Sequence, residues 1–516
     1  MTTHTYLQAK DNYSGPKRSL IIAGGGMRVA YQAGVLQALQ EADICFTHAD
    51  GTSGGTINLA MLLSGLSPQE MCQRWRSLDI SDFVSFVPAQ EYLKAHDMLA
   101  MGDADGITAK VFPHLGIDVD KIRQSQGITG TFNVCNFSRK TNEAISNQDL
   151  SLELLIAGIS LPVFMPPIEV NNQLYTDSVW IKDANLIEAV KRGAQELWLI
   201  WCIGNTPNYQ TGVFNQYVHM IELSANGALF EEFERIRELN TRIAEGDSPY
   251  GQTSPIRLHV LKPTSPLPLD PDLYLGRIDN TTLISMGYAD TKAYLSSLHE
   301  EGLAFSPETT QMQESLSLGI TFRETMAGGF SLGNTDPLIG AKEGNAQGLE
   351  LAMHVAITIR DFEAFARDPH HQGELHGMID FQPFAKGIPA SEGVFNLFSP
   401  ADDPHSKYMI YELAFEHEGQ AYYLAGKKKV KDDLGFDLWE DTTTLYTTLH
   451  KGIDKEAPIV GAGILKLGIK ELVKLATSMH AINAKTIQQK MTTISKFGSF
   501  FMGELWDSYA KFVSDD

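Results

Sequence analysis

The sequence is short of positive charge, of cysteine and of long apolar runs, and each shortage excludes a class of protein. Its 516 residues include 41 Lys and Arg against 63 Asp and Glu, which gives a net charge of −22. This balance disfavours binding to nucleic acid or to anionic membranes through bulk electrostatics. Any contact with a membrane must therefore be local and largely apolar.

Cysteine usage and hydropathy together indicate the compartment. The four cysteines, Cys45, Cys72, Cys135 and Cys202, form no CxxC pair, which predicts buried free thiols instead of a disulfide framework. The N-terminus lacks the apolar run of roughly 7–15 residues that a signal peptide needs, and no uninterrupted apolar stretch reaches the roughly 18 that span a bilayer. We therefore expect a cytoplasmic protein, although signal-independent export would leave no trace of this kind.

The length predicts two domains, because one hydrophobic core usually stops growing at roughly 250–300 residues. After a polar segment, 1–17, short apolar runs alternate with helix-like stretches over 18–298, which is typical of an α/β domain with a largely parallel sheet. We expect a linker over 299–320 and a β-rich accessory domain over 321–516 that ends in amphipathic helices.

Particular elements follow from the apolar patterns. In the first domain we expect strands at 19–23, 132–137 and 197–203, with helices at 29–40 and 185–194.

In the second domain, strict alternation predicts a half-buried strand over 349–359, and 408–416 with 421–430 predict a hairpin. From about Gly461 the spacing turns helical, with an apolar stripe that packs on its own domain or, alternatively, on a membrane surface or partner.

Two polar stretches are expected at the surface. The basic run Lys427-Lys428-Lys429 is typical of a solvated strand end, with contact to an anionic head group as the alternative. The histidines of 368–376 are in no register that would converge on a metal from one helix, so a polar loop is expected there and no metal site.

The strongest chemical signal is a GxSxG motif, Gly51-Thr52-Ser53-Gly54-Gly55, directly before the helix-like stretch 57–64. In a nucleophile elbow the serine lies on a tight strand-to-helix turn, where Gly51 and Gly55 remove Cβ atoms that would clash. Backbone N–H groups and the helix dipole there favour negative charge near an attacked carbonyl.

A second glycine-rich segment, Gly24-Gly25-Gly26-Met27-Arg28, follows the first predicted strand. Three glycines let backbone N–H groups converge on an oxyanion or a phosphate. A dinucleotide fingerprint would need glycine at Val29, and a phosphate-binding loop would need a Gly-Lys-Ser/Thr that is missing, so both nucleotide patterns fail.

These two segments, together with Asp177 after the stretch Pro162-Val163-Phe164-Met165-Pro166-Pro167, resemble the three sequence blocks of the patatin-like phospholipase family over about 18–298. The resemblance implies a three-layer α/β/α hydrolase with no metal or organic cofactor. It implies phospholipase A or lipid acyl hydrolase activity on phospholipid or related lipid esters, with peripheral contact to a membrane.

The resemblance also implies roles for single residues. Ser53 is the nucleophile, and Asp177 is its base in a Ser–Asp dyad. Gly24, Gly25 and Gly26 form the oxyanion hole. Arg28, at the position of the family's basic residue after the glycines, orients the loop or contacts a phosphate head group.

One departure from the family leaves alternatives open. The family usually has glycine after the catalytic aspartate, whereas this chain has Ser178, whose Cβ limits positive φ. A lipid-binding protein on an inactive hydrolase fold and an esterase or thioesterase for small acyl chains therefore remain as alternatives. A further alternative is that a histidine, such as His48, His219 or His259, is the base in place of Asp177.

The C-terminal region resembles a module found beside cholesterol-oxidase-like members of the glucose-methanol-choline oxidoreductases. The matching stretches are 322–329, 393–398, 426–430 and 439–445. This resemblance implies no catalytic residues. The predicted antiparallel sheet either carries a lipid-binding face or only covers the hydrolase domain.

Overall fold

The computed structural model describes residues 5–10, 13–83, 85–86, 100, 102–204, 209, 211–267, 278–313, 317–401, 406–431, 442–484 and 486–510. The chain forms two compact units. The first comprises Met1–Tyr274 and Asp290–Glu314, and the second comprises Leu275–Ala289 and Ser315–Asp516.

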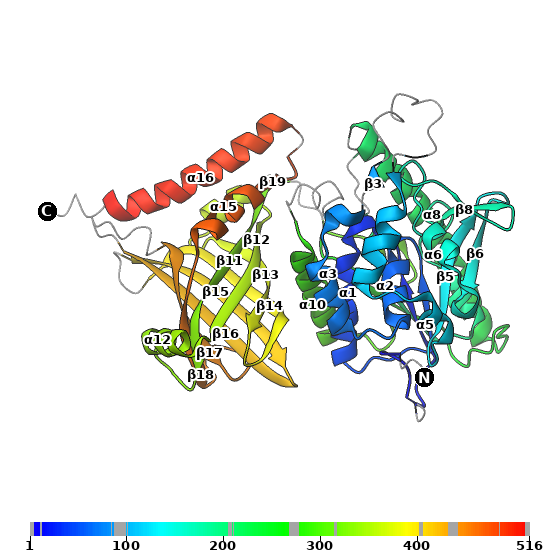
Figure 1. The fold of residues 1–516 in the computed structure, drawn as a ribbon, viewed down its shortest axis with the longest axis horizontal. Coiled ribbons are helices and arrows are strands. Elements are labelled where there is room, and N and C mark those ends of the chain that lie inside the picture. Colours follow the sequence, from blue (N-terminus) through cyan, green and yellow to red (C-terminus); the bar gives the residue numbers. More distant parts are fainter. Residues whose placement is uncertain are drawn as a thin grey trace. The chain divides into compact units, whose positions relative to one another are not determined.

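An eight-stranded sheet covered by helices forms the first unit (Figure 1). Its strand order is β10-β9-β1-β2-β5-β8-β7, and β6 also pairs with β5. The strands are β1 (Arg18–Ile22), β2 (His48–Gly51), β5 (Thr129–Asn136), β6 (Thr141–Ser146), β7 (Ile168–Val170), β8 (Gln173–Asp177), β9 (Glu196–Ile200) and β10 (Arg257–Leu261). The strands expected at 19–23, 132–137 and 197–203 correspond to β1, β5 and β9.

The prediction of a largely parallel sheet is confirmed for β10, β9, β1, β2 and β5. The exceptions are β6, β7 and β8, which pair antiparallel. The reason is local: β7 and β8 form a hairpin whose turn residues Asn171 and Asn172 both have positive φ, as a tight hairpin turn requires.

The helices of this unit cover strands that are buried along their length, as Leu20, Ile21 and Ile22 are in β1. They are α1 (Ala30–Glu41), α2 (Gly54–Leu63), α3 (Pro68–Ser77), α4 (Phe112–Leu115), α5 (Val119–Gln124), α6 (Leu152–Ala157), α7 (Leu186–Lys191), α8 (Val213–Ala244) and α11 (Pro307–Thr310). Helix α10 (Asn280–Ser296) is divided between the two units at Asp290. The helices expected at 29–40 and 185–194 correspond to α1 and α7.

The sheet register brings together positions that are far apart in the sequence. Ile22, the last residue of β1, pairs with Gly51, the last residue of β2. Gly51 pairs in turn with Phe132 of β5, and Val134, two residues further along β5, pairs with Asp177 at the end of β8. The segments that follow β1, β2 and β8 therefore meet at one edge of the sheet.

An antiparallel sheet that closes on itself forms the second unit. Strand β11 pairs with β12 at one side and with β18 at the other, so the path from β12 to β18 returns to β11. The strands are β11 (Gly319–Leu332), β12 (Glu350–Ile359), β13 (Gln372–Phe381), β14 (Ala385–Pro400), β15 (Ser406–His417), β16 (Gln420–Lys431), β17 (Thr444–His450), β18 (Ile459–Lys466) and β19 (His480–Ile482).

The β-rich second domain is thus confirmed, including the strand expected at 349–359 and the hairpin of β15 and β16 around Gly419. The expected helical start near Gly461 is wrong, because β18 occupies that segment. Helix α15 (Ile469–Ser478) begins only after it, and α16 (Ile487–Ala510) extends across one end of the sheet (Figure 1). Helices α12 (Pro337–Gln347) and α13 (Phe362–Arg367) and the residues of α10 up to Ala289 also belong to this unit.

Helix α15 packs on its own domain in part: Leu472 and Met479 of the predicted stripe contact the apolar core of the closed sheet. Ile469 and Val473 of the same stripe are 76% and 58% exposed. Phe497 of α16 is buried in the same core. Across the described residues, no helix combines the length and the apolar character that crossing a bilayer requires.

The predicted surface location of the lysine run is wrong for its middle residue. Side chains on a strand alternate between faces, so Lys428 points into the closed sheet while its neighbours point out. Lys428 is 1% exposed and its Nζ lies 3.0 Å from Glu324 Oε1. The Tyr411 hydroxyl donates to the other Glu324 oxygen at 2.9 Å, so the buried charges are paired and hydrogen-bonded.

The stretch 368–376 is likewise only partly a loop. It begins as a loop after α13, but β13 starts at Gln372 and contains His376. Burial lowers the pKa of His376.

Candidate active site

Ser53 lies in the tight turn between β2 and α2. Because β2 ends at Gly51 and α2 begins at Gly54, only two residues make the turn. Ser53 has φ 50° and ψ −131°, a strained conformation for a residue with a Cβ atom, and such strain clusters at functional sites. The backbone therefore has the geometry that a nucleophile elbow requires.

The glycine at position 55 lets α2 approach β1. A Cβ atom built on Gly55 would lie 2.2 Å from Ile22 O and 2.5 Å from Ala23 O, both rigid backbone atoms. The Thr52 N–H donates to Ile22 O at 3.1 Å, which ties the turn to the adjacent strand. Only glycine leaves room for this packing, so the elbow depends on it.

The Asp177 carboxyl group lies next to the Ser53 side chain, which acts to lower its pKa. The Val179 N–H donates a hydrogen bond to one carboxyl oxygen at 2.9 Å and fixes its position. Burial outweighs both groups and raises the pKa of Asp177 to about 7. A carboxylate with a pKa near neutrality is a better base for a hydroxyl group than an ordinary aspartate.

The glycine loop offers two free N–H groups and not the three expected. The Gly24 N–H donates to both carboxylate oxygens of Asp183, each at 3.1 Å. Within the described chain, the N–H groups of Gly25 and Gly26 have no hydrogen-bond acceptor. Gly24 is therefore corrected from an oxyanion donor to a structural residue of the loop, because a buried carboxylate already occupies its N–H.

Arg28 contacts the loop. Its Nε donates to Gly25 O at 2.8 Å, and its backbone N–H donates to the same oxygen at 3.1 Å. The side chain is buried, with 8% exposed. These contacts match the first of its two implied roles, orienting the loop.

Ser178 fits its position without a positive φ. It is fully buried, and its hydroxyl donates to Asn142 Oδ1 on β6. The residue that departs from the family pattern is thus accommodated by a hydrogen bond, and Asp177 still reaches Ser53.

The three histidines considered as bases are engaged elsewhere. His48 is held between the hydroxyls of Ser19 and Thr131, and burial lowers its pKa to about 3. His259 stacks on Trp198, and His219 stacks on Tyr209 of the same segment. Asp177, by contrast, has the Ser53 side chain beside its carboxyl group.

An aromatic cluster lies beside Asp177. Tyr217 of α8 packs edge-on against Phe164 and Trp180, with ring centroids 5.4 and 5.5 Å apart, and its hydroxyl donates to Pro162 O at 2.6 Å. Burial and the charge of Asp177 both raise the pKa of Tyr217. Trp180 follows Asp177 by three residues in the chain. Apolar side chains therefore flank the site.

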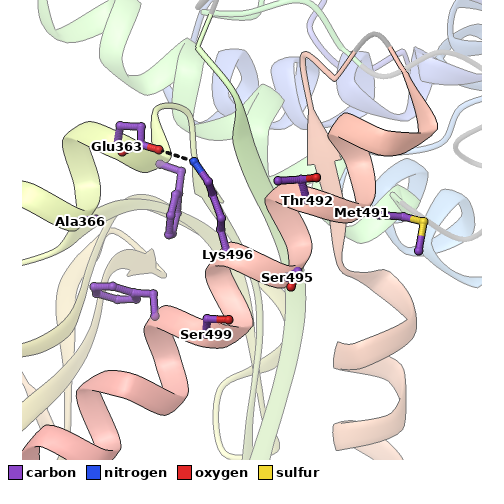
Figure 2. A pocket seen from close by; sticks show the side chains of 9 residues that line it. Glu363, Ala366, Met491, Thr492, Ser495, Lys496 and Ser499 are labelled. Atoms are coloured by element: carbon purple, nitrogen blue, oxygen red, sulfur yellow. Dashed lines mark hydrogen bonds and ion pairs between the residues drawn. The ribbon is translucent and has the colours of Figure 1, made fainter.

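A cleft in the second unit lies between α13 and α16 (Figure 2). It is lined by Phe362, Ala366 and Phe500 with several small polar residues. Its charged groups, Lys496 and Glu363, pair with each other at 2.8 Å. Among the described residues, no hydrogen bond is seen between a serine of the lining and Lys496 or Glu363.

Comparison with known proteins agrees with the geometry of the first unit. A family model described as patatin-like phospholipase matches residues 20–190. Among solved structures, the chain is similar to the type III effector protein ExoU at 13% identity, covering 57% of this chain and 77% of that chain with a TM-score of 0.19. A TM-score that low supports no conclusion about fold or activity. No curated protein matches the chain.

The first unit therefore contains a patatin-like α/β domain, and the match supports a lipid hydrolase in general. The match ends within α7 and does not reach the second unit. The resemblance of the C-terminal region to the oxidoreductase-associated module stays a prediction. Trp439, Glu440 and Asp441, which carry part of that resemblance, lie outside the described residues.

Proposed function

We propose that this chain is a serine acyl hydrolase that cleaves phospholipids or related lipid esters and releases fatty acid. The observation that carries the proposal is the position of Ser53, strained in a strand-to-helix turn, next to the buried carboxyl group of Asp177, whose pKa it lowers. The free N–H groups of Gly25 and Gly26 supply the third requirement, donors for a developing oxyanion.

The reaction follows from these positions. Asp177 accepts the Ser53 hydroxyl proton while Oγ attacks the ester carbonyl carbon, and the carbonyl oxygen becomes an oxyanion bound by the Gly25 and Gly26 N–H groups. As the ester C–O bond breaks, Asp177 returns the proton to the leaving alcohol. Water then attacks the acyl-serine and gives its proton to Asp177. Release of the fatty acid restores the Ser53 hydroxyl with that proton.

A fluorophosphonate probe tests the nucleophile directly. We expect covalent labelling of the unaltered chain at Ser53, located by mass spectrometry of the labelled peptide, and no labelling of Ser53→Ala. Ser64→Ala is the matched control, since Ser64 is a buried serine at the other end of α2. Labelling that survives in Ser53→Ala, or is absent from the unaltered chain, would contradict the assignment.

The first half of α8 supplies the local apolar contact with lipid. Val213, Met220 and Leu223 are 87%, 57% and 75% exposed. Val163 is also exposed, and its neighbours Pro162 and Phe164 contact Tyr217 of the same helix. Residues 211–224 include no Lys or Arg and only one carboxylate, which fits a zwitterionic lipid surface better than an anionic one.

The double substitution Met220→Asp with Leu223→Asp tests this surface. We expect hydrolysis of phosphatidylcholine vesicles to fall by more than about tenfold, since burying one large apolar side chain contributes about 1.5–3 kcal/mol. Hydrolysis of soluble p-nitrophenyl butyrate should stay unchanged. Leu338→Asp, at a 64% exposed position on α12, is the control. Equal losses on both substrates, or no loss on vesicles, would refute the contact.

A further inference from the structure

Asp183 is a buried carboxylate that has no part in the proposed reaction. It lies between β8 and α7, in the segment that begins with Asp177, and is fully buried. Its position is fixed from both sides along the chain. Lys182 pairs with Glu232 of α8 at 2.5 Å, and the Asn185 amide donates to Asn133 of β5 at 2.8 Å. The carboxylate therefore projects from a rigid segment.

Gly24 is held between Asp183 and Ser53. A Cβ atom built on Gly24 would lie 2.3 Å from Asp183 Oδ1 and 2.9 Å from Ser53 Cβ. With its N–H donated to both Asp183 oxygens, Gly24 has little freedom to rotate. Gly24 thus lies in contact with the Asp183 carboxyl group on one side and with Ser53 on the other.

The next peptide group of the loop is fixed from the opposite end. The Gly25 carbonyl accepts from the Arg28 Nε and the Arg28 N–H. Gly26 then continues in a left-handed conformation, with φ 58°. The Gly24 N–H and the Gly25 carbonyl are therefore both held by hydrogen bonds. The N–H groups of Gly25 and Gly26 have no acceptor among the described residues, and the two held groups fix their directions.

We infer that Asp183 is a positioning residue: it holds the Gly24 N–H so that the N–H groups of Gly25 and Gly26 face the carbonyl attacked by Ser53. The inference rests on the proposed function, because it assigns a task to a residue of that same site. Preorganised donors matter because an oxyanion hole stabilises charge only if its groups need no rearrangement as the charge forms.

The ionisation of the two carboxylates agrees with this division of roles. Burial and the charge of Asp177 raise the pKa of Asp183 to about 8, against the Gly24 N–H and Arg28, which lower it. Burial raises the pKa of Asp177 as well, so the two neighbouring carboxyl groups both hold protons more strongly than ordinary aspartates. A protonated Asp183 still accepts the Gly24 N–H through its carbonyl oxygen, and an asparagine amide can do the same.

Two substitutions at this position separate positioning from mere stability. Asp183→Ala removes the acceptor, and we expect kcat for p-nitrophenyl butyrate to fall by about 10²–10³, the cost of losing an oxyanion donor, with KM changed by less than about threefold. Asp183→Asn keeps an acceptor of the same shape, so its kcat should stay within about tenfold of the unaltered value.

Amide hydrogen exchange reports on the loop independently of activity. In the folded protein we expect faster exchange in the peptide spanning residues 20–30 for Asp183→Ala but not for Asp183→Asn, with peptides from β15 and β16 unchanged as the control. If the unaltered chain is inactive, the proposed function fails, while the exchange comparison still decides the role of Asp183.

Three results would overturn the inference. One is an Asp183→Ala protein with unaltered kcat. Another is a loss of kcat that is equal in Asp183→Ala and Asp183→Asn. The third is unchanged exchange in the loop peptide of Asp183→Ala. If Asp183→Ala does not fold, Asp183→Asn decides alone: retained kcat and loop protection support the inference, and loss of either overturns it.

Discussion

Replacing Ser53 with alanine is expected to lower the hydrolysis of a soluble ester by about 10⁴–10⁶-fold, as when one member of a catalytic unit is removed. In the proposed reaction the Ser53 hydroxyl, which lies next to the Asp177 carboxyl group, forms the acyl intermediate, and alanine removes it. Adding Asp177→Asn to this variant should lower kcat little further, because the two residues act in one proton transfer. Steady-state rates on p-nitrophenyl butyrate for the single and double variants measure both effects.

The matched control for this series is Ser64→Ala, which removes a buried hydroxyl from the same helix without touching the dyad. It should keep the unaltered rate. Losses that multiply in the double variant would mean that Ser53 and Asp177 act independently. That result would contradict the dyad.

Asp177→Asn alone should lower kcat/KM by about 10⁴, because an amide does not accept the Ser53 proton.

The same reasoning gives the pH dependence of the unaltered chain. Burial raises the pKa of Asp177 to about 7, and only the ionised carboxylate is a base, so kcat/KM should be constant well above pH 7 and decline below it. The decline should be about tenfold per pH unit. A profile with an acid limb near pH 4 would show that Asp177 is not the base.

Thermal unfolding separates this loss of activity from a loss of structure. A carboxyl group whose folded pKa is raised from 3.8 to about 7 stabilises the fold below pH 4, and this contribution is lost as the pH rises through 7. Asp177→Asn has no charge to bury, so its Tm should exceed that of the unaltered chain by a few degrees or more at pH 8. The difference should disappear near pH 4. A lower Tm at pH 8 would indicate that the variant is inactive because it is damaged.

The candidate site was predictable where a local pattern fixes the local structure. Gly51-Thr52-Ser53-Gly54-Gly55 predicts a tight turn before a helix because only glycine allows the backbone contact made at Gly55. The apolar residues of β1 predict a buried parallel strand in the same way. The prediction of Asp177 as a site residue depended on the family resemblance. Asp177 reaches the level of Ser53 because β2 and β8 both pair with β5, and no short segment of the sequence encodes that pairing.

The features that the sequence did not predict depend on contacts between distant segments. Asp183 follows no motif, and its only signal was an aspartate near Asp177 before a helix. Its contact with Gly24 arises from the packing of β1 against the segment that follows β8. For Lys428 the sequence predicted a surface position, because a basic run is typical of a surface. The alternation of side chains along the strand instead turns Lys428 toward Glu324, which belongs to a strand far away in the chain.

Fatty-acid release from phosphatidylcholine vesicles, compared between the unaltered chain and Ser53→Ala under identical lipid and salt, tests the central claim most directly. The account predicts that the unaltered chain releases fatty acid together with an equal amount of lysophospholipid, and that Ser53→Ala stays at the level of buffer. No release above the Ser53→Ala level would contradict the claim that Ser53 and Asp177 form a lipid acyl hydrolase.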